Sequence, residues 1–328
     1  MTQRRILFIS KGEKSASTRY RALTYFPYLQ ETGWYVQHLT ADRGPLKRLQ
    51  LLQHAAQADV VVVLRKTFSA AFLYLLRRFS RHLVFDFDDA IFLRSNGEPS
   101  NLRMQRFRGM MKACDQVWAG NSYLADTAQH LNKTVNILPT SVKPEKYLVT
   151  AKQADNYIYL VWIGSSSTRK YLVNVLPVLE SLSLKYPQCR LKIIADFDLD
   201  TTSIKTLPVQ WDTATEAKEL VSSHIGIAPM IDNPWTQGKC ALKILQYMAS
   251  GLAVVASPAG VNKDVVINNE TGYLVTTNDD WLKALQTLIM DASLRKKLGE
   301  AGRRRVVEDY SEASTANKML ACLNRLLD

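Results

Sequence analysis

The chain has 328 residues, of which 47% are hydrophobic and 22% are charged. This length and hydrophobic content predict a soluble globular protein of two domains, each large enough to bury its own core. No apolar run is long enough to span a bilayer, and the run at 6–9 is too short for a signal peptide, so it predicts a first strand. The four cysteines include no CxxC pair, which argues against structural zinc and a disulfide framework and favours a reducing cytoplasm.

The net charge of +12 lies almost entirely in the first half of the chain. Residues 1–150 contain 22 lysines and arginines against 11 acidic residues, whereas residues 151–328 contain 20 against 19. Only the first half is therefore expected to attract polyanions or anionic lipid. A peripheral position at the inner membrane face stays open beside a purely cytoplasmic one.

Strand and helix patterns alternate through the first half. The apolar runs that predict strands are 6–10, 36–39, 60–64, 83–87, 114–119 and 135–138. The intervening patterns predict helices, among them 46–58, 65–81 and 123–131. This alternation predicts an α/β fold with a parallel, doubly wound sheet. The loop after the first strand contains Gly12, whose amides offer a ligand close access to the backbone.

Charged groups follow or interrupt these elements at three places. The strand at 83–87 runs directly into Asp88 and Asp89, and carboxylates at such a position serve as a general base, a metal ligand or a hydroxyl-binding group. A metal-free site is preferred, because lysines predicted near the phosphate site supply neutralising charge. The helix at 65–81 is amphipathic and either faces the core or lies on a membrane. The basic stretch 94–112 is either a lip over an anionic acceptor or an exposed helix.

The second half begins with the same pattern of strand, glycine loop and helix as the first. A strand at 157–163 is followed by Gly164, Ser165 and a polar run that ends in Arg169 and Lys170, before another helix. Two such halves facing each other across a cleft predict a nucleotide-binding architecture, with Arg169 or Lys170 against phosphate. Prolines and polar residues place the linker at about 140–156.

The stretch 225–262 predicts a strand, a loop, a helix, a second strand and a glycine loop. The helix is expected to carry Lys239 and Lys243 at its N-terminus, which suits an anion. The loop before it lies at the carboxyl edge of the strands, where ligands bind in parallel sheets. A phosphate-bearing ligand is therefore predicted here.

Several motifs together resemble the retaining nucleotide-sugar glycosyltransferases of family 4. The strongest is LKILQYMASGLAVVASPAG followed by NNETGYLV. Weaker ones, in the family's order, are CDQVWAGNSYLADTAQHL with NILPTSVKP, VWIGSSSTRKYL and EDYSEASTANKML. The resemblance implies the GT-B fold, in which two Rossmann-like domains face a cleft. It assigns 1–150 to the acceptor, 151–310 to the nucleotide-sugar donor, and about 311–328 to a helix that returns to the first domain.

The resemblance also implies roles for single residues. The family's two glutamates, which are separated by seven residues, correspond to Gly238 and Gln246, and Gln246 can still bind ribose through its amide. Asp88 stands where many relatives have a histidine near the reacting sugar. The expected catalytic residues are Asp88, Lys170 and Lys239. The expected donor-binding residues are Gly12, Gly164, Ser165, Arg169, Asp232, Gly238, Lys243, Gln246, Gly260 and Val261.

The predicted reaction is sugar transfer from a nucleoside-diphosphate sugar to an acceptor hydroxyl, with retained anomeric configuration and without a metal or another bound cofactor. The partners are then the nucleotide-sugar and a glycan or glycolipid acceptor of cell-surface assembly, with an anionic membrane surface as a further partner. Nucleic acid is not expected, because no aromatic-basic recognition motif occurs. Two alternatives stay open, a nucleotide-sugar epimerase and a non-catalytic module that binds anionic glycan or lipid.

Overall fold

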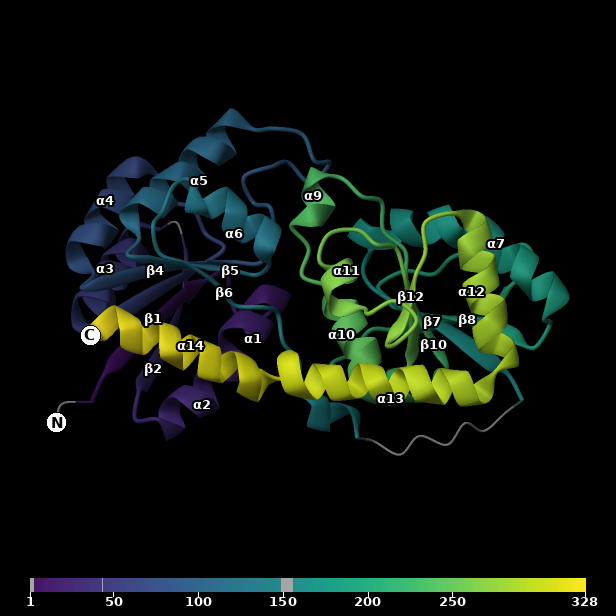
Figure 1. The fold of residues 1–328 in the computed structure, drawn as a ribbon. Coiled ribbons are helices and arrows are strands. Elements are labelled where there is room, and N and C mark those ends of the chain that lie inside the picture. Colours follow the sequence, from purple (N-terminus) through teal and green to yellow (C-terminus); the bar gives the residue numbers. More distant parts are fainter. Residues whose placement is uncertain (1–2, 43, 149–155) are drawn as a thin grey trace. The chain divides into compact units, whose positions relative to one another are not determined.

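The computed structural model describes residues 3–42, 44–148 and 156–328. The chain divides into two compact units, each described here by itself (Figure 1). The first unit contains Met1–Ser141, Asn233–Cys240 and Glu312–Asp328, and the second contains Val142–Asp232 and Ala241–Ser311. Residues 149–155 of the predicted linker lie outside the described residues.

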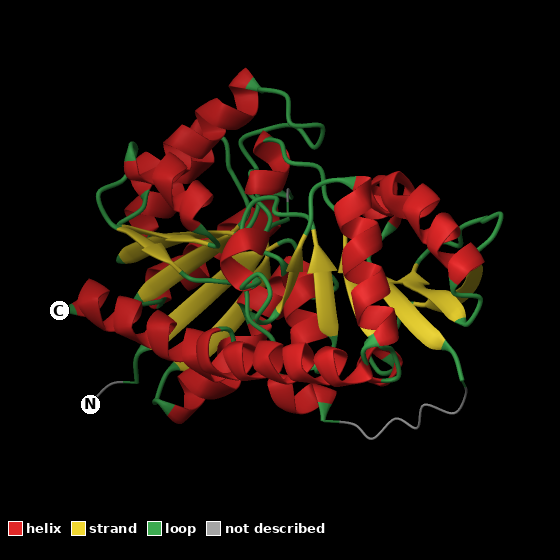
Figure 2. Cartoon of the chain, turned by 45° about the vertical axis from the view of Figure 1, so that its right-hand side comes forward, coloured by secondary structure: helices red, strands yellow, loops and turns green. Residues whose placement is uncertain are grey.

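Each unit contains a six-stranded sheet in which every pair of neighbouring strands is parallel. The order is β2-β1-β3-β4-β5-β6 in the first unit and β12-β11-β10-β7-β8-β9 in the second. Helices cover the strands of each unit (Figure 2). The predicted α/β class with two doubly wound parallel sheets is confirmed.

The inner strands of the first sheet are buried on both faces, and their residues are mostly apolar. Its strands are β1 (Arg5–Ser10), β2 (Tyr35–Thr40), β3 (Val60–Leu64), β4 (His82–Phe87), β5 (Gln116–Ala119) and β6 (Val135–Ile137). All five residues of β3, VVVVL, are buried. Because side chains alternate along a strand, Val61 and Val63 pack into one hydrophobic cluster and Val60 and Val62 into another.

The helices of the first unit come from both ends of the chain, with one short helix from its middle. They are α1 (Ala16–Arg21), α2 (Phe26–Glu31), α3 (Pro45–Gln57), α4 (Ala70–Phe79), α5 (Asn101–Ala113), α6 (Ser122–Gln129), α9 (Pro234–Gln237) and α14 (Glu312–Leu327), with the 3-10 turn η1 (Leu23–Tyr25). The last helix places Met319 and Leu323 in the same cluster as Val60 and Val62. The C-terminal segment therefore completes one face of the first unit.

The second unit repeats this layering. Its strands are β7 (Ile158–Ile163), β8 (Cys189–Ala195), β9 (Lys205–Gln210), β10 (Ile225–Ala228), β11 (Ala253–Ala256) and β12 (Gly272–Leu274). Its helices are α7 (Arg169–Lys185), α8 (Glu216–Val221), α10 (Leu242–Ala249), α11 (Asn262–Val265), α12 (Asn278–Met290) and α13 (Ala292–Asp309), with the 3-10 turns η2 (Pro144–Tyr147) and η3 (Ser166–Thr168). Helices α7 and α12 cover one face, where Leu172, Leu179 and Leu285 join the strand side chains.

Two predicted helix starts are wrong. The helix predicted over 65–81 begins only at Ala70, because Arg65 adopts a left-handed backbone with φ of 55° and the chain then runs as a loop. The helix predicted to carry Lys239 begins at Leu242, because Ala241 is left-handed with φ of 53°. Lys239 therefore lies outside α10. Within the described ranges, no helix is long and apolar enough to cross a bilayer.

The packing of α14 predicts that substitutions at two neighbouring positions differ in their effect on stability. Leu323 is fully buried and Asn324 is exposed one position later. Leu323→Ala should lower the free energy of unfolding by about 2–5 kcal/mol, because it removes buried apolar contacts and leaves a cavity. Asn324→Ala should change it by less than about 0.5 kcal/mol. Urea denaturation of both variants checks this, and equal midpoints would contradict the docking of α14.

Candidate functional site

The loop after β7 has a conformation that excludes a side chain at Gly164. A Cβ added there would lie 2.3 Å from the Trp162 ring and 2.8 Å from Thr168 Oγ1. The next residue, Ser165, forms a capping box with Thr168, in which Thr168 Oγ1 accepts from the Ser165 amide at 3.3 Å and donates to its carbonyl at 3.0 Å. This loop delivers the chain into α7.

The start of α7, beyond the carboxyl end of β7, presents two exposed cations. The Arg169 guanidinium lies 5.7 Å from the Phe197 ring, and Lys170 Nζ lies 5.2 Å from the Tyr171 ring. The Ser166 amide donates to Asp196 at 2.8 Å. Hydrogen bonds from the side chain and the amide of Ser166 lower the pKa of Asp196. Asp196 therefore fixes the loop as a carboxylate while both cations stay at the surface.

Trp162 links this loop to α10. Its ring, which would block a Cβ at Gly164, also lies 4.4 Å from Lys243 Nζ. The ring therefore brings Lys243 to the same part of the unit as the loop after β7. A cation over an aromatic face is held by the ring quadrupole.

Gln246 and Tyr247 of α10 are both buried. Gln246 is 4% exposed. The Tyr247 hydroxyl accepts from the Ile163 amide at 2.9 Å and donates to the Ile227 carbonyl at 3.2 Å, so it joins β7 to β10. Burial raises the pKa of Tyr247, which keeps this hydroxyl protonated. Because α10 is fixed in this way, the position of Gln246 is fixed as well.

Two further loops lie at the same edge of the second sheet. Ser257 follows β11, and its hydroxyl accepts from the Met230 amide at 3.0 Å, which ties the loop after β10 to the loop after β11. Gly260 is left-handed, with φ of 53°, and Val261 precedes α11. Asp232 is exposed at the end of the β10 loop.

The first unit contains a cluster of opposite charges beyond β4. Asp88 Oδ1 lies 3.2 Å from Arg65 Nε, and Asp89 pairs with the Arg65 guanidinium. Asp89 also accepts from Lys239 Nζ at 2.8 Å. The Asp88 Oδ1 atom is buried and takes part in no hydrogen bond among the described residues, despite its nearby cation. A buried acceptor of this kind is suited to a hydroxyl donor.

Lys239 reaches Asp89 because residues 233–240 pack on the first unit; we call this segment the strap. A Cβ added at Gly238 would lie 2.6 Å from the Ala90 amide nitrogen and 2.7 Å from Ala90 Cβ. Position 238 therefore has no room for a side chain such as glutamate. Glycine therefore fits at this position, for which the resemblance to family 4 implies a glutamate.

Asn121 and Cys240 hold the end of the strap. The Asn121 side-chain amide donates to the carbonyls of Gln237 at 3.0 Å and Lys239 at 2.9 Å. Its oxygen accepts from the Leu124 amide at 2.9 Å and caps α6. The Cys240 sulfur packs against Gly120, and burial raises the pKa of its thiol. One capping residue therefore fixes both α6 and the strap.

The loop after β1 is braced by a buried ion pair. Gly12 has φ of 121°, and its amide donates to Ser10 Oγ at 3.1 Å. Arg21 Nε donates to both carboxylate oxygens of Asp86 at 2.9 Å. Burial raises the pKa of Asp86 to about 6, and the charge of Arg21 opposes that rise. This pair fixes α1 against β4.

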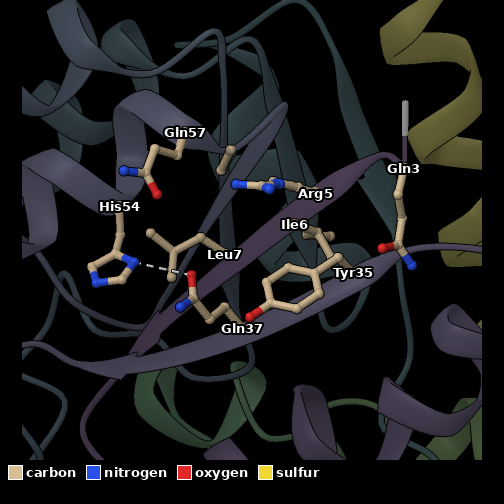
Figure 3. A pocket seen from close by; sticks show the side chains of 9 residues that line it. Gln3, Arg5, Ile6, Leu7, Tyr35, Gln37, His54 and Gln57 are labelled. Carbon is tan, nitrogen blue, oxygen red and sulfur yellow. Dashed lines mark hydrogen bonds between the residues drawn. The ribbon is translucent and has the colours of Figure 1, made fainter. Parts of the chain in front are cut away.

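A pocket at the other edge of the first sheet is separate from these groups. It lies at the starts of β1 and β2, where Arg5 and Tyr35 line it (Figure 3). His54 Nδ1, from the end of α3, is 3.1 Å from Gln37 Oε1. This pocket lies at the amino edge of the sheet, whereas Asp88 and Gly12 follow the carboxyl ends of their strands.

The second unit, with its loops at the carboxyl edge of a parallel sheet, matches a known family. The model described as glycosyl transferases group 1 covers residues 148–305. Residues 148–305 match this family model, and we call them the group 1 domain. The expected resemblance to glycosyltransferases is confirmed at this level.

Curated and solved relatives agree with this group 1 domain. The sulfoquinovosyl transferase SQD2 of Arabidopsis thaliana is 28% identical over 149 residues, which are 43% of this chain and 29% of that protein. The chain thus spans less than a third of this relative. Sucrose-phosphate synthase from Thermosynechococcus elongatus superposes with a TM-score of 0.76 at 16% identity and covers 99% of both chains. HepE from Anabaena, in complex with UDP and glucose, has a TM-score of 0.76 at 14% identity, over 98% of this chain and 100% of that one. These likenesses show the GT-B fold.

The structure sorts the predicted site residues between the units. The second unit holds Gly164, Ser165, Arg169, Lys170, Asp232, Lys243, Gln246, Gly260 and Val261, whereas Gly12, Asp88, Gly238 and Lys239 belong to the first unit. Trp162 brings Lys243 and the Gly164 loop together, and Lys239 instead pairs with Asp89. Three positioning groups escaped the sequence interpretation. Arg65 could have been found because it follows a buried strand, and Asn121 because it precedes a helix. Trp162 has no such signal, since its sequence context is that of an ordinary core residue.

The fit of Gly238 against Ala90 can be tested with a single methyl group. Gly238→Ala should displace the strap or cost about 1–3 kcal/mol of stability, because the added Cβ collides with backbone. Thiol labelling of Cys240, identified by mass spectrometry, should accelerate as the strap loosens. Gly109→Ala is the matched control in the same unit, since its Cβ would meet only Leu73 Cδ2 at 3.5 Å. Unchanged stability and labelling in Gly238→Ala would contradict the contact.

Proposed function

We propose that this chain transfers a sugar from a nucleoside-diphosphate sugar to an acceptor hydroxyl, with retention of anomeric configuration. The observation that carries the proposal is the group 1 domain, whose loop after β7 and Lys243 meet at Trp162. HepE, a neighbour of the same fold, is described in complex with UDP, and UDP is therefore the first nucleotide to test. The acceptor class is a glycan or glycolipid of cell-surface assembly.

The second unit supplies the groups for the donor. Arg169, Lys170 and Lys243 bind the diphosphate and stabilise the negative charge that develops on it as the sugar departs. The backbone at Gly260 and Val261 approaches the same diphosphate, and Gln246 binds ribose hydroxyls. No metal step is needed in this mechanism, because three cationic side chains offset the charge.

The first unit supplies Asp88 for a hydroxyl of the sugar or the acceptor. The buried Oδ1 atom of Asp88 gains a hydrogen bond when such a hydroxyl donates to it. Arg65 Nε lies 3.2 Å from Asp88 Oδ1 and helps to hold this carboxylate in place. Lys239 acts through Asp89, to which its Nζ donates a hydrogen bond at 2.8 Å.

Nucleotide binding tests the donor site. At about 100 times its dissociation constant, the cognate nucleoside diphosphate should stabilise the protein by about 2.7 kcal/mol. Thermal unfolding with UDP, GDP, ADP, TDP and CMP identifies it. Lys170→Ala and Lys243→Ala should each weaken binding by about 10- to 150-fold, because each removes a charged contact to phosphate.

Lys185→Ala provides the control for this experiment. Lys185 lies at the far end of α7, is exposed and stacks on Tyr186 at 5.6 Å, much as Lys170 stacks on Tyr171. Its loss should leave nucleotide binding unchanged. No stabilisation by any nucleotide would refute the transferase. If one nucleotide binds, incubation with its sugar conjugates followed by NMR of the released or transferred sugar tests the reaction and the anomeric configuration.

A further inference from the structure

A second cavity in the first unit lies beyond the carboxyl ends of β2 and β3. Its volume is about 300 Å³. Cationic side chains from three elements line it, namely Arg48 of α3, Lys66 of the loop after β3, and Arg106 of α5. The hydroxyl-bearing residues Thr67 and Ser69 complete the same wall.

The acidic group of this cavity is already paired with a lysine. Asp42 Oδ2 accepts from Lys47 Nζ at 2.6 Å, and Lys47 is not among the lining residues. The three lining cations therefore exceed the one lining carboxylate, whose charge is offset by Lys47. In a concave wall such an excess raises the local concentration of anions.

Two features adapt the cavity to a phosphate. The Arg48 guanidinium lies 5.1 Å from the Phe72 ring, which restricts its orientation before any ligand binds. Helix α4 begins next to Ser69 with no acidic residue in its first turn and no side-chain cap at Ser69. Its first amides and the positive end of its dipole therefore add to the charge of the side chains.

The cavity lies at the same sheet edge as Asp88. The loop that provides Lys66 begins with Arg65, and Arg65 pairs with both Asp88 and Asp89. The left-handed backbone of Arg65 marks the point where the chain leaves β3 for this loop. A molecule anchored in the cavity thus lies at the same edge of the sheet as Asp88, to which the proposed function assigns hydroxyl binding.

We propose that this cavity binds a phosphate group of the acceptor, so that the acceptor is a phosphate ester and not a neutral glycan. Arg48, Lys66 and Arg106 hold the anion and thereby select the acceptor. This inference rests on the proposed transferase function, which makes the bound molecule an acceptor. Phosphate binding itself is measurable without any reaction. The phosphate belongs either to a lipid headgroup or to a soluble ester, and two arms of the test separate these sources.

The test measures binding of inorganic phosphate to the full chain by calorimetry and by thermal unfolding. Arg48→Gln and Arg106→Gln should each weaken phosphate binding at least about tenfold, because each removes a charged contact. Arg78→Gln is the control for net charge, since Arg78 is exposed on α4 and does not line the cavity. Arg106 is itself exposed, so its variant remains informative if Arg48→Gln fails to fold.

Donor-site variants separate this cavity from the nucleotide site. Lys170→Ala should lose nucleotide binding and keep phosphate binding, whereas Arg106→Gln should show the reverse. If phosphate binding instead disappears in Lys170→Ala and persists in Arg106→Gln, the proposal is overturned. Equal losses in Arg78→Gln and Arg106→Gln would also overturn it, because they would show a non-specific charge effect. Absence of nucleotide binding in the unsubstituted chain would refute the transferase alone.

Vesicles of phosphatidylcholine with and without phosphatidylglycerol form the second arm. Arg48-dependent binding to the anionic vesicles supports the cavity with a lipid phosphate as its source. Phosphate binding without vesicle binding supports the cavity with a soluble phosphate ester. Failure of both inorganic phosphate and anionic vesicles to bind at low ionic strength, where charge interactions are least screened, would refute the site.

Discussion

Burial of both faces of a parallel sheet is the constraint on which each unit depends. A strand such as β3 can be apolar at every position only if helices cover both its faces. Parallel pairing then brings all the carboxyl ends to one edge, and polar or glycine residues collect in the loops that leave it. Asp88, Gly12 and Gly164 lie in such loops, each after a strand whose side chains are mostly buried.

The strap adds a second constraint, in which the size of one side chain decides the local chemistry. Ala90 leaves no space for a Cβ at Gly238, so Lys239 and Cys240 follow the path that this contact imposes. Lys239 then faces Asp89, and its charge is used to balance the Asp88-Asp89 pair together with Arg65. Lys239 is thus engaged with a carboxylate of the first unit, and the same contact leaves no space for a glutamate side chain at position 238.

The sequence predicts the layered architecture well because buried parallel strands have a distinctive pattern. The apolar runs of β1, β3 and β7 lie within one or two residues of the predicted positions. The partners of single charges are less accessible, because they depend on contacts between residues far apart in the chain. Lys239 and Lys243 are four positions apart and read alike, yet one meets Asp89, 150 residues earlier, and the other meets Trp162. The left-handed backbone of Ala241 separates them, and alanine gives little local signal for that conformation.

The charge of the first half now has a more specific interpretation than attraction to polyanions in general. Some of its cations are paired with carboxylates, since Arg21 is buried with Asp86, and Arg65 is paired with Asp88 and Asp89. Such paired cations contribute little to long-range attraction, because their partners cancel them at a distance. The excess that remains includes Arg48 and Arg106, which line one cavity together with Lys66. The cations of the first half thus include some that are paired at the sheet edge and others that line the cavity proposed to bind a phosphate.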